Sequence, residues 1–322
     1  MIQHSINKVM KSKGLVLGVV TFALLLGSQC SNPKTPTITE TPTRGNIRIM
    51  ADASFQPLVD AEIYTFTSLY KYAHIAPVYV PEKDLITEFL KDSVKVIVTS
   101  WEPSEEQKKL LMDAQTVLRS TTVAYDAIAL VINKENMDSL FTYKNVNDIF
   151  TGKLTDWKEL NASSKLGKMI AVFDNEKSAN IRYFKEEFKL ENQLPTNFYS
   201  VNTNEEVIDY VSKNKSAIGL VSVNWICDKE DSTSRSFTDK IKIAAVSHRV
   251  LDPGSFFQPV QGSIYDKSYP FTRKINLLSR ESFSGLGSGF ISWVAAEQGQ
   301  RIVLKAGLVP ATMPIRLIQI KK

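Results

Sequence analysis

Residues 46–100 read "NIRIMADASFQPLVDAEIYTFTSLYKYAHIAPVYVPEKDLITEFLKDSVKVIVTS", and this stretch decides the fold class. Short apolar runs typical of strands alternate in it with longer segments that gather their apolar residues on one helical face. The strands are expected at 46–51, 76–81 and 94–100, and the helices at 55–70 and 82–92. This order predicts a largely parallel sheet covered by helices, which is an α/β fold.

The rest of the chain continues the alternation. A long apolar run at 124–133 is typical of a buried strand. Further helices are expected at 102–114, 146–152, 206–214 and 287–307, and further strands at 168–173 and 216–223. Ser54 is expected to cap the helix at 55–70, and the glycines Gly152 and Gly307 are expected to end two others.

Three loops carry hydroxyl and amide side chains from the end of a strand to the start of a helix, at 51–54, 99–104 and 174–180. Helix starts present unpaired N–H groups, which suit an anion. In open α/β sheets such loops meet at the carboxyl ends of the strands. The sequence therefore predicts a converging anion site, although each of these side chains is equally typical of a plain helix cap.

The first thirty residues resemble a targeting segment. Lys8, Lys11 and Lys13 precede the apolar run 14–27, which is too short for an ordinary membrane-spanning helix. Cys30 follows, as in bacterial lipoprotein signals, where such a Cys is lipidated; simple cleavage and an uncleaved anchor are the alternatives. Residues 31–45 are rich in Pro and Thr and predict a flexible tether.

Composition excludes several classes of protein. The formal net charge is +5, and three of these charges belong to the leader, so no basic field for nucleic acid remains. If Cys30 carries lipid, Cys227 has no cysteine with which to pair. No metal-binding or nucleophile motif is present, which indicates a protein without cofactor, metal site or enzymatic activity.

The segment "DAIALVINKENMDSLFTYKNVNDIFTGKLTDWKEL" (126–160) resembles the PstS-like substrate-binding proteins of phosphate ABC transporters. These carry a similar D-x-I-A…V-N strand followed by I-F-x-G-x-(I/L)-x-x-W. The matching positions here are Asp126, Ile128, Ala129, Val131, Asn133, Ile149, Phe150, Gly152, Leu154 and Trp157. Similar family segments follow in the same order at 216–223, 269–278 ("YPFTRKINLL") and 290–311.

The resemblance implies a two-lobed periplasmic-binding-protein fold of type II, with a mixed sheet in each lobe and the ligand in a cleft between the lobes. Lobe 1 would comprise 46–125 and 255–322, and lobe 2 would comprise 126–254. The chain would cross between lobes near 124–128 and again near 246–262. The cleft would close around its ligand by a hinge motion.

The resemblance also implies a ligand set. It comprises Ser54, Phe55, Thr99, Ser100, Ser178, Asn180 and Arg182. In the family's second loop an Asp and an Arg are expected where this chain has Lys95 and Trp101, and in its third loop an Arg is expected where this chain has Ile181. Arg182 and Glu102 are the two residues that could replace the lost groups, and Trp101 is either a packing residue or a wall of the cleft.

The sequence thus predicts a monomeric, lipid-anchored protein facing the periplasm, which captures phosphate or a related oxyanion for an inner-membrane ABC permease. One alternative is a lipoprotein that kept the fold and lost transport, acting as a sensor or scaffold. Another is a binder of a different small ligand, such as an organic phosphate or a sulfonate.

Overall fold

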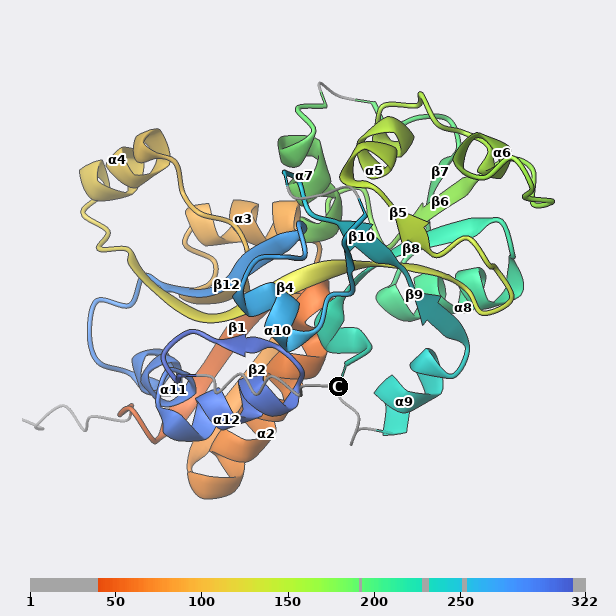
Figure 1. Ribbon diagram of the computed structural model, residues 1–322. Coiled ribbons are helices and arrows are strands. Elements are labelled where there is room, and N and C mark those ends of the chain that lie inside the picture. The colour runs from red at the N-terminus through yellow and green to blue at the C-terminus, as the bar shows by residue number, and fades with distance from the viewer. Residues whose placement is uncertain (1–39, 191–192, 228–231, 251–253, 315–322) are drawn as a thin grey trace, which may run out of the picture. The chain divides into compact units, whose positions relative to one another are not determined.

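The computed structural model describes residues 40–190, 193–227, 232–250 and 254–314 (Figure 1). The expected signal segment, with Cys30, and most of the expected tether lie outside the described residues. The end of that tether is not a free linker. Thr41 and Arg44 pair in a turn, and Glu40 accepts a hydrogen bond from the backbone N–H of Leu286 at 3.1 Å. The expectation of a tether is therefore wrong for residues 40–45.

The described part of the chain contains one large sheet and one small one. The large sheet has the path β2-β1-β3-β12-β4-β8-β6-β7, with β13 and β9 also pairing with β4, and the small one is β11-β10-β5. The strands are β1 (Gly45–Asp52), β2 (Ala73–Val80), β3 (Val96–Thr99), β4 (Arg119–Asn133), β5 (Leu140–Phe141), β6 (Ile170–Phe173), β7 (Phe198–Ser200), β8 (Ala217–Ser222), β9 (Ile241–Ile243), β10 (Ala245–Ser247), β11 (Phe256–Phe257), β12 (Thr272–Ser279) and β13 (Val309–Pro310).

Helices and two short 3₁₀ turns, η1 and η2, connect the strands. They are η1 (Ala53–Phe55), α2 (Gln56–Leu69), α3 (Glu82–Leu90), α4 (Glu105–Asp113), α5 (Tyr143–Phe150), α6 (Trp157–Leu160), α7 (Ala179–Glu187), α8 (Asn204–Lys213), η2 (Val223–Trp225), α9 (Ser232–Thr238), α10 (Gln261–Tyr265), α11 (Leu286–Val294) and α12 (Glu297–Lys305). The predicted α/β class is confirmed.

Strand β4 joins two halves of the large sheet. Its 15 residues pair along their first part with β12 and β13, and along their last part with β8 and β9. We call β1, β2, β3, β12 and β13 the first half, and β6, β7, β8 and β9 the second half. Parallel pairs lie in both, β1 with β2 and β3, and β6 with β7 and β8. The change of partner near Ile128 falls at the expected crossing, whereas the lobe boundaries themselves stay a prediction.

One buried part of the core lies where β4 and β8 meet helix α8. Val131 of β4 and Val207 and Val211 of α8 are buried there, and each such side chain contributes roughly 1.5–3 kcal/mol by leaving water. Gly219 on β8 is required by this packing. A Cβ at that position would lie 2.8 Å from side-chain atoms of Val131 and Val207, so a change of Gly219 to alanine would overpack the core.

Two details of the predicted helices are wrong. Ser54 does not cap α2, because Asp52 caps the preceding turn η1 and accepts the N–H of Ser54 at 2.9 Å. The segment 287–307 is not one helix but two, α11 and α12. The backbone of Val294 comes so close to Gly299 that a Cβ there would lie 2.4 Å from it, so the glycine lets α12 pack against the end of α11. Gly307 ends α12 with φ of 79°, as expected.

Candidate functional site

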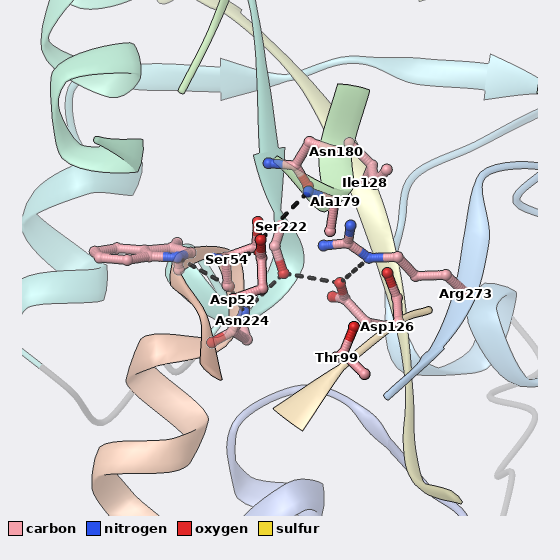
Figure 2. A network of polar contacts seen from close by, with 12 residues as sticks. Asp52, Ser54, Thr99, Asp126, Ile128, Ala179, Asn180, Ser222, Asn224 and Arg273 are labelled. Carbon is pink, nitrogen blue, oxygen red and sulfur yellow. Dashed lines mark hydrogen bonds and ion pairs between the residues drawn. The ribbon is translucent and has the colours of Figure 1, made fainter. Parts of the chain in front are cut away.

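Buried polar side chains gather where the strands of both halves end. Asp52 is the last residue of β1, Thr99 the last of β3 and Ser222 the last of β8, while Asp174 directly follows β6. All four are at most 3 % exposed. Parallel strands present their carboxyl ends at a common edge, which is where α/β proteins place their sites. The predicted convergence of the strand-end loops is therefore visible in the structure (Figure 2).

An inner cluster forms around Arg273 of β12, with Asp126, Ser222, Asn224 and Ser54. The guanidinium Nε of Arg273 donates to Asp126 Oδ2 at 2.9 Å, and the Ser222 hydroxyl donates to the same oxygen at 2.8 Å. Asn224 donates to Ser222 Oγ at 2.7 Å and to the carbonyl of Ser54 at 2.6 Å. The inner cluster therefore joins residues of β1's loop, β4, β8 and β12 in one network (Figure 2).

The guanidinium of Arg273 is fixed in position, but two of its nitrogen atoms donate no hydrogen bond to the described residues. Its Cζ lies 4.7 Å from the ring centre of Phe55, in the range of a cation–π contact. Its Nη1 and Nη2 atoms, however, are buried and have no hydrogen-bond partner among the described residues. The hydroxyl of Ser54 is in the same condition. A buried donor without a partner costs about 1–3 kcal/mol, so this region favours a group that accepts several hydrogen bonds.

Asp52 bridges the two halves of the sheet. Besides the N–H of Ser54, its carboxylate accepts the N–H of Ala179, the first residue of α7, at 3.3 Å. Burial raises the pKa of Asp52 to about 7, and the nearby carboxylates Glu82 and Asp174 add to the effect. Burial also raises the pKa of Asp126, against the opposing charge of Arg273. The site can therefore hold a proton near neutral pH.

An outer cluster consists of Glu82, Thr99, Ser100 and Arg182. Glu82 Oε1 accepts Thr99 Oγ1 at 2.7 Å, the N–H of Ser100 at 3.0 Å and its hydroxyl at 2.9 Å. Arg182 pairs through Nε with the other oxygen of Glu82, and its Nη2 donates to Ser100 Oγ at 2.9 Å. Three residues predicted as oxyanion ligands thus lie together, with a carboxylate of the chain itself between them.

The remaining predicted ligands lie on the first turn of α7. Ser178 caps this helix by accepting the N–H of Ile181 at 3.4 Å, and its hydroxyl donates to Asp174 at 2.8 Å. The amide of Asn180 donates to the same Asp174 oxygen at 3.4 Å, while its Oδ1 has no partner among the described residues. Burial raises the pKa of Asp174. The structure therefore places both residues in the site and shows Ser178 to be a helix cap as well.

Two possibilities from the sequence are not supported. Glu102 does not replace the family's buried Asp, because its side chain is 59 % exposed and pairs with Lys274 at 2.8 Å. Lys95 is also at the surface, where it pairs with Asp92 at 2.7 Å. Trp101 is only 7 % exposed and packs with Leu85 and Phe89, which makes it a core residue rather than a wall of the site.

Sequence reasoning missed two important residues. Arg273 lies in the segment "YPFTRKINLL", which resembles a family segment but gave no reason to expect a site residue. Only the pairing of β12 with β4 brings Arg273 to Asp126. Glu82 was expected only as the start of a helix. No local pattern joins it to Arg182, which is 100 residues away in the sequence.

Comparison with known proteins agrees with this architecture. The sequence profile of the PBP superfamily domain matches residues 36–298. The phosphate-binding protein PstS of Staphylococcus epidermidis is 25 % identical over 200 residues, which is 61 % of this chain and 58 % of that protein. PstS of Staphylococcus aureus is 26 % identical over 218 residues, 64 % of this chain and 60 % of that protein. The chain thus spans less than two thirds of these relatives.

Solved structures share the fold. A phosphate ABC transporter substrate-binding protein from Clostridium perfringens, solved with bound phosphate, superposes with a TM-score of 0.70 at 23 % identity, covering 83 % of this chain and 100 % of that one. An ABC-type phosphate transport receptor from Vibrio cholerae gives a TM-score of 0.63 at 18 % identity, covering 83 % and 100 %.

Proposed function

Because this chain belongs to the PBP superfamily, we propose that it is a solute-binding protein that captures phosphate or a related oxyanion and delivers it to an ABC transporter. The relatives named for phosphate binding support this ligand class. The protein performs no chemistry on its ligand in this proposal. Its task is to bind at the strand ends and to release to a permease.

The unpartnered donors of Arg273 and Ser54 carry the proposal. A tetrahedral oxyanion offers several acceptor oxygens to the two Nη atoms and the hydroxyl, all of which are buried. Charge-assisted hydrogen bonds from a guanidinium are among the strongest in proteins. In this proposal Arg273 supplies the cation that the family's third loop would carry. Of the predicted ligands, Ser54 belongs to this cluster and Phe55 contacts the guanidinium of Arg273, while Ser178 and Asn180 on the first turn of α7 are proposed to complete the site.

The surplus of carboxylates favours phosphate over sulfate. Asp52, Asp126 and Asp174 are all buried in the site, with Arg273 as the cation of the inner cluster. A fully deprotonated dianion would be repelled by any of them that is ionised. Phosphate carries a proton near neutral pH and can donate it to one of these carboxylates, whereas sulfate has none to give.

The location of the protein follows from the same proposal. Within residues 40–314, with the gaps given above, no helix has the length and apolarity needed to cross a bilayer. We propose that the chain is exported, that Cys30 is lipidated and holds it at the membrane facing the periplasm, and that it acts as a monomer. Replacing Cys30 by Ser should release the protein from the membrane fraction, and continued retention would contradict the anchor.

Isothermal titration of the purified full chain in mild detergent tests the function. The protein is first freed of bound anion by partial unfolding and dialysis, and phosphate, arsenate, sulfate and molybdate are then titrated. We expect a single phosphate equivalent with micromolar or tighter affinity and a weaker response to sulfate. The absence of heat with every oxyanion, from a protein whose circular dichroism shows it to be folded, would refute the proposal.

One observation favours a second candidate. Thr99, Ser100 and Arg182 are already engaged by Glu82, so three of the seven predicted ligands are not free for an external oxyanion. This arrangement fits a lipoprotein that kept the fold and acts as a sensor or scaffold. The same titration separates the two, since a scaffold would bind no oxyanion.

A further inference from the structure

The carboxylate of Glu82 is surrounded by hydrogen-bond donors in the way that a bound anion would be. It is the first residue of α3, and its side chain is 1 % exposed. Four hydrogen bonds end on its carboxylate, three from Thr99 and Ser100 and one from Arg182. Carboxylate and phosphate groups share this kind of recognition by hydroxyl, N–H and guanidinium donors.

These contacts join the two halves of the sheet. Helix α3 packs on β1 and β3 of the first half, whereas α7, which carries Arg182, packs on β8 of the second. We call the contact between α3 and α7 the seam. The backbone N–H of Lys83 also crosses it, donating to the carbonyl of Lys177 at 3.1 Å. The pair of Lys177 and Asp84 crosses it at 3.0 Å, but both side chains are about half exposed, so this pair contributes little.

Glu82 is the buried charge of the seam. Burial by itself would raise the pKa of Glu82, but the charge of Arg182 and the hydrogen bonds from Arg182, Thr99 and Ser100 outweigh it, so the pKa is lowered. The carboxylate is therefore ionised at neutral pH, and its loss would leave Arg182 and the two hydroxyls short of an acceptor. Glu186 also pairs with Arg182 at 2.7 Å, but its side chain is exposed on α7. It is therefore not placed to replace Glu82 as the acceptor for Thr99 at the end of β3.

We propose that Glu82 is a built-in anion: its carboxylate takes the donors of Thr99, Ser100 and Arg182 that an external oxyanion would otherwise receive, and thereby holds α3 against α7 without a ligand. Glu82 is then a specificity-determining residue, because it limits the external anion to the inner cluster. This inference deepens the proposed function and rests on it for the identity of the external ligand.

A cavity makes the outer cluster reachable. It has a volume of about 430 Å³, lies along the seam, and is lined by Glu82, Ser178 and Arg182 together with residues of both helices. If the Glu82 side chain is shortened to that of alanine, a small carboxylate from solution can enter through this cavity. Formate reproduces the removed head group, so it is the probe of choice.

The test is chemical rescue of the full chain, followed by thermal unfolding. Glu82→Ala should lower the melting temperature, and sodium formate at about five times its Kd should restore roughly 2–4 °C relative to equal sodium chloride. Formate should have no such effect on the unmodified protein or on Glu186→Gln, which removes the exposed partner of Arg182. The double variant Glu82→Ala/Arg182→Met should lose the rescue.

A second variant guards against misfolding of the first. Glu82→Gln keeps the shape of the side chain and removes its charge, which should weaken the contact between α3 and α7. The backbone amides of Lys83 and Ala179, which donate hydrogen bonds across the two halves, should therefore exchange hydrogen faster than in Glu186→Gln. Unchanged melting in Glu82→Ala, rescue that persists without Arg182, or unchanged exchange in Glu82→Gln would each overturn the built-in anion. Phosphate titration of the unmodified protein tests the proposed function separately. The built-in anion and the proposed phosphate binding can therefore be refuted independently of each other.

Discussion

At the scale of single residues, Arg273 is the position on which anion capture depends. Its pair with Asp126 is almost completely buried, at 3 % and 0 % side-chain exposure. Removing one partner of such a pair is strongly destabilising, since it leaves the other charge buried alone. A single substitution at Arg273 would therefore confuse loss of binding with loss of folding.

The double variant Arg273→Met/Asp126→Asn resolves this difficulty. We expect Arg273→Met alone to lower the free energy of unfolding by about 3–5 kcal/mol, and the double variant to lose clearly less, because it removes both charges. Both variants should lose phosphate binding by titration. Arg280→Met serves as the control, since Arg280 pairs with Asp92, outside the site. Phosphate bound by the folded double variant as tightly as by the unmodified protein would exclude Arg273 as the ligand cation.

Asp52 should make the site sensitive to pH. Its pKa of about 7 in the folded protein, against 3.8 as the ordinary value, means that the folded state binds a proton that the unfolded state has lost between these pH values. The free energy of unfolding should thus fall as pH rises through this window, by roughly 1–4 kcal/mol from this residue. Asp52→Asn should flatten that part of a urea-unfolding profile, and an unchanged slope would show that Asp52 is ionised throughout.

Residues also mark the limit of what the sequence could predict. The positions of Ser54, Thr99 and Ser178 near the ends of strands could be predicted, because strand-end hydroxyls are a local pattern, whereas their role as ligands stays a prediction. Glu82 could not be found, because its role arises only when α3 meets α7. Ser54 was wrongly predicted to cap α2: Asp52, two residues earlier, caps the turn η1 by accepting the N–H of Ser54, and the Ser54 hydroxyl has no hydrogen-bond partner among the described residues.

At the scale of elements, helix α7 combines a capping role and a proposed binding role in Ser178. Helix α4 provides a matched control, because Ser104 caps it by accepting the N–H of Gln107 at 3.2 Å and is exposed at the surface, outside the inner and outer clusters. Ser104→Ala and Ser178→Ala should each cost about 0.5–2 kcal/mol of stability. Only Ser178→Ala should also weaken phosphate binding, as measured by titration. Equal phosphate affinity in both variants would reduce Ser178 to a cap.

The order of elements was predictable, whereas their ends and breaks were less so. Alternating apolar runs gave β1, β2, β3 and β8 within a few residues, because buried strands in an α/β fold are apolar on both faces. The break between α11 and α12 was invisible as a pattern, since both helices keep their apolar faces inward. It depends on the approach of Val294 to Gly299, which is a contact and not a periodicity.

At the scale of the whole described body, β4 raises the question of hinge motion. Only the middle of this strand changes partners from the first half to the second, so a small bend there would move one half against the other. Three sets of contacts oppose such a bend: the seam around Glu82, the bond from Ala179 to Asp52, and the hydrogen bonds of Asn224 and Trp225 to Ser54. The ligand-free protein is therefore expected to stay closed.

Distances between spin labels measure this directly. Labels at exposed Lys109 on α4 and Lys158 on α6 report on the two halves, and a pair at Lys158 and Glu205 reports within the second half alone. In the otherwise unmodified protein, phosphate should leave both distance distributions unchanged. In Glu82→Ala the first distribution should widen toward longer distances and narrow again with phosphate, while the second stays fixed. A first distribution that shortens with phosphate while Glu82 is present would mean that the ligand, and not Glu82, closes the two halves.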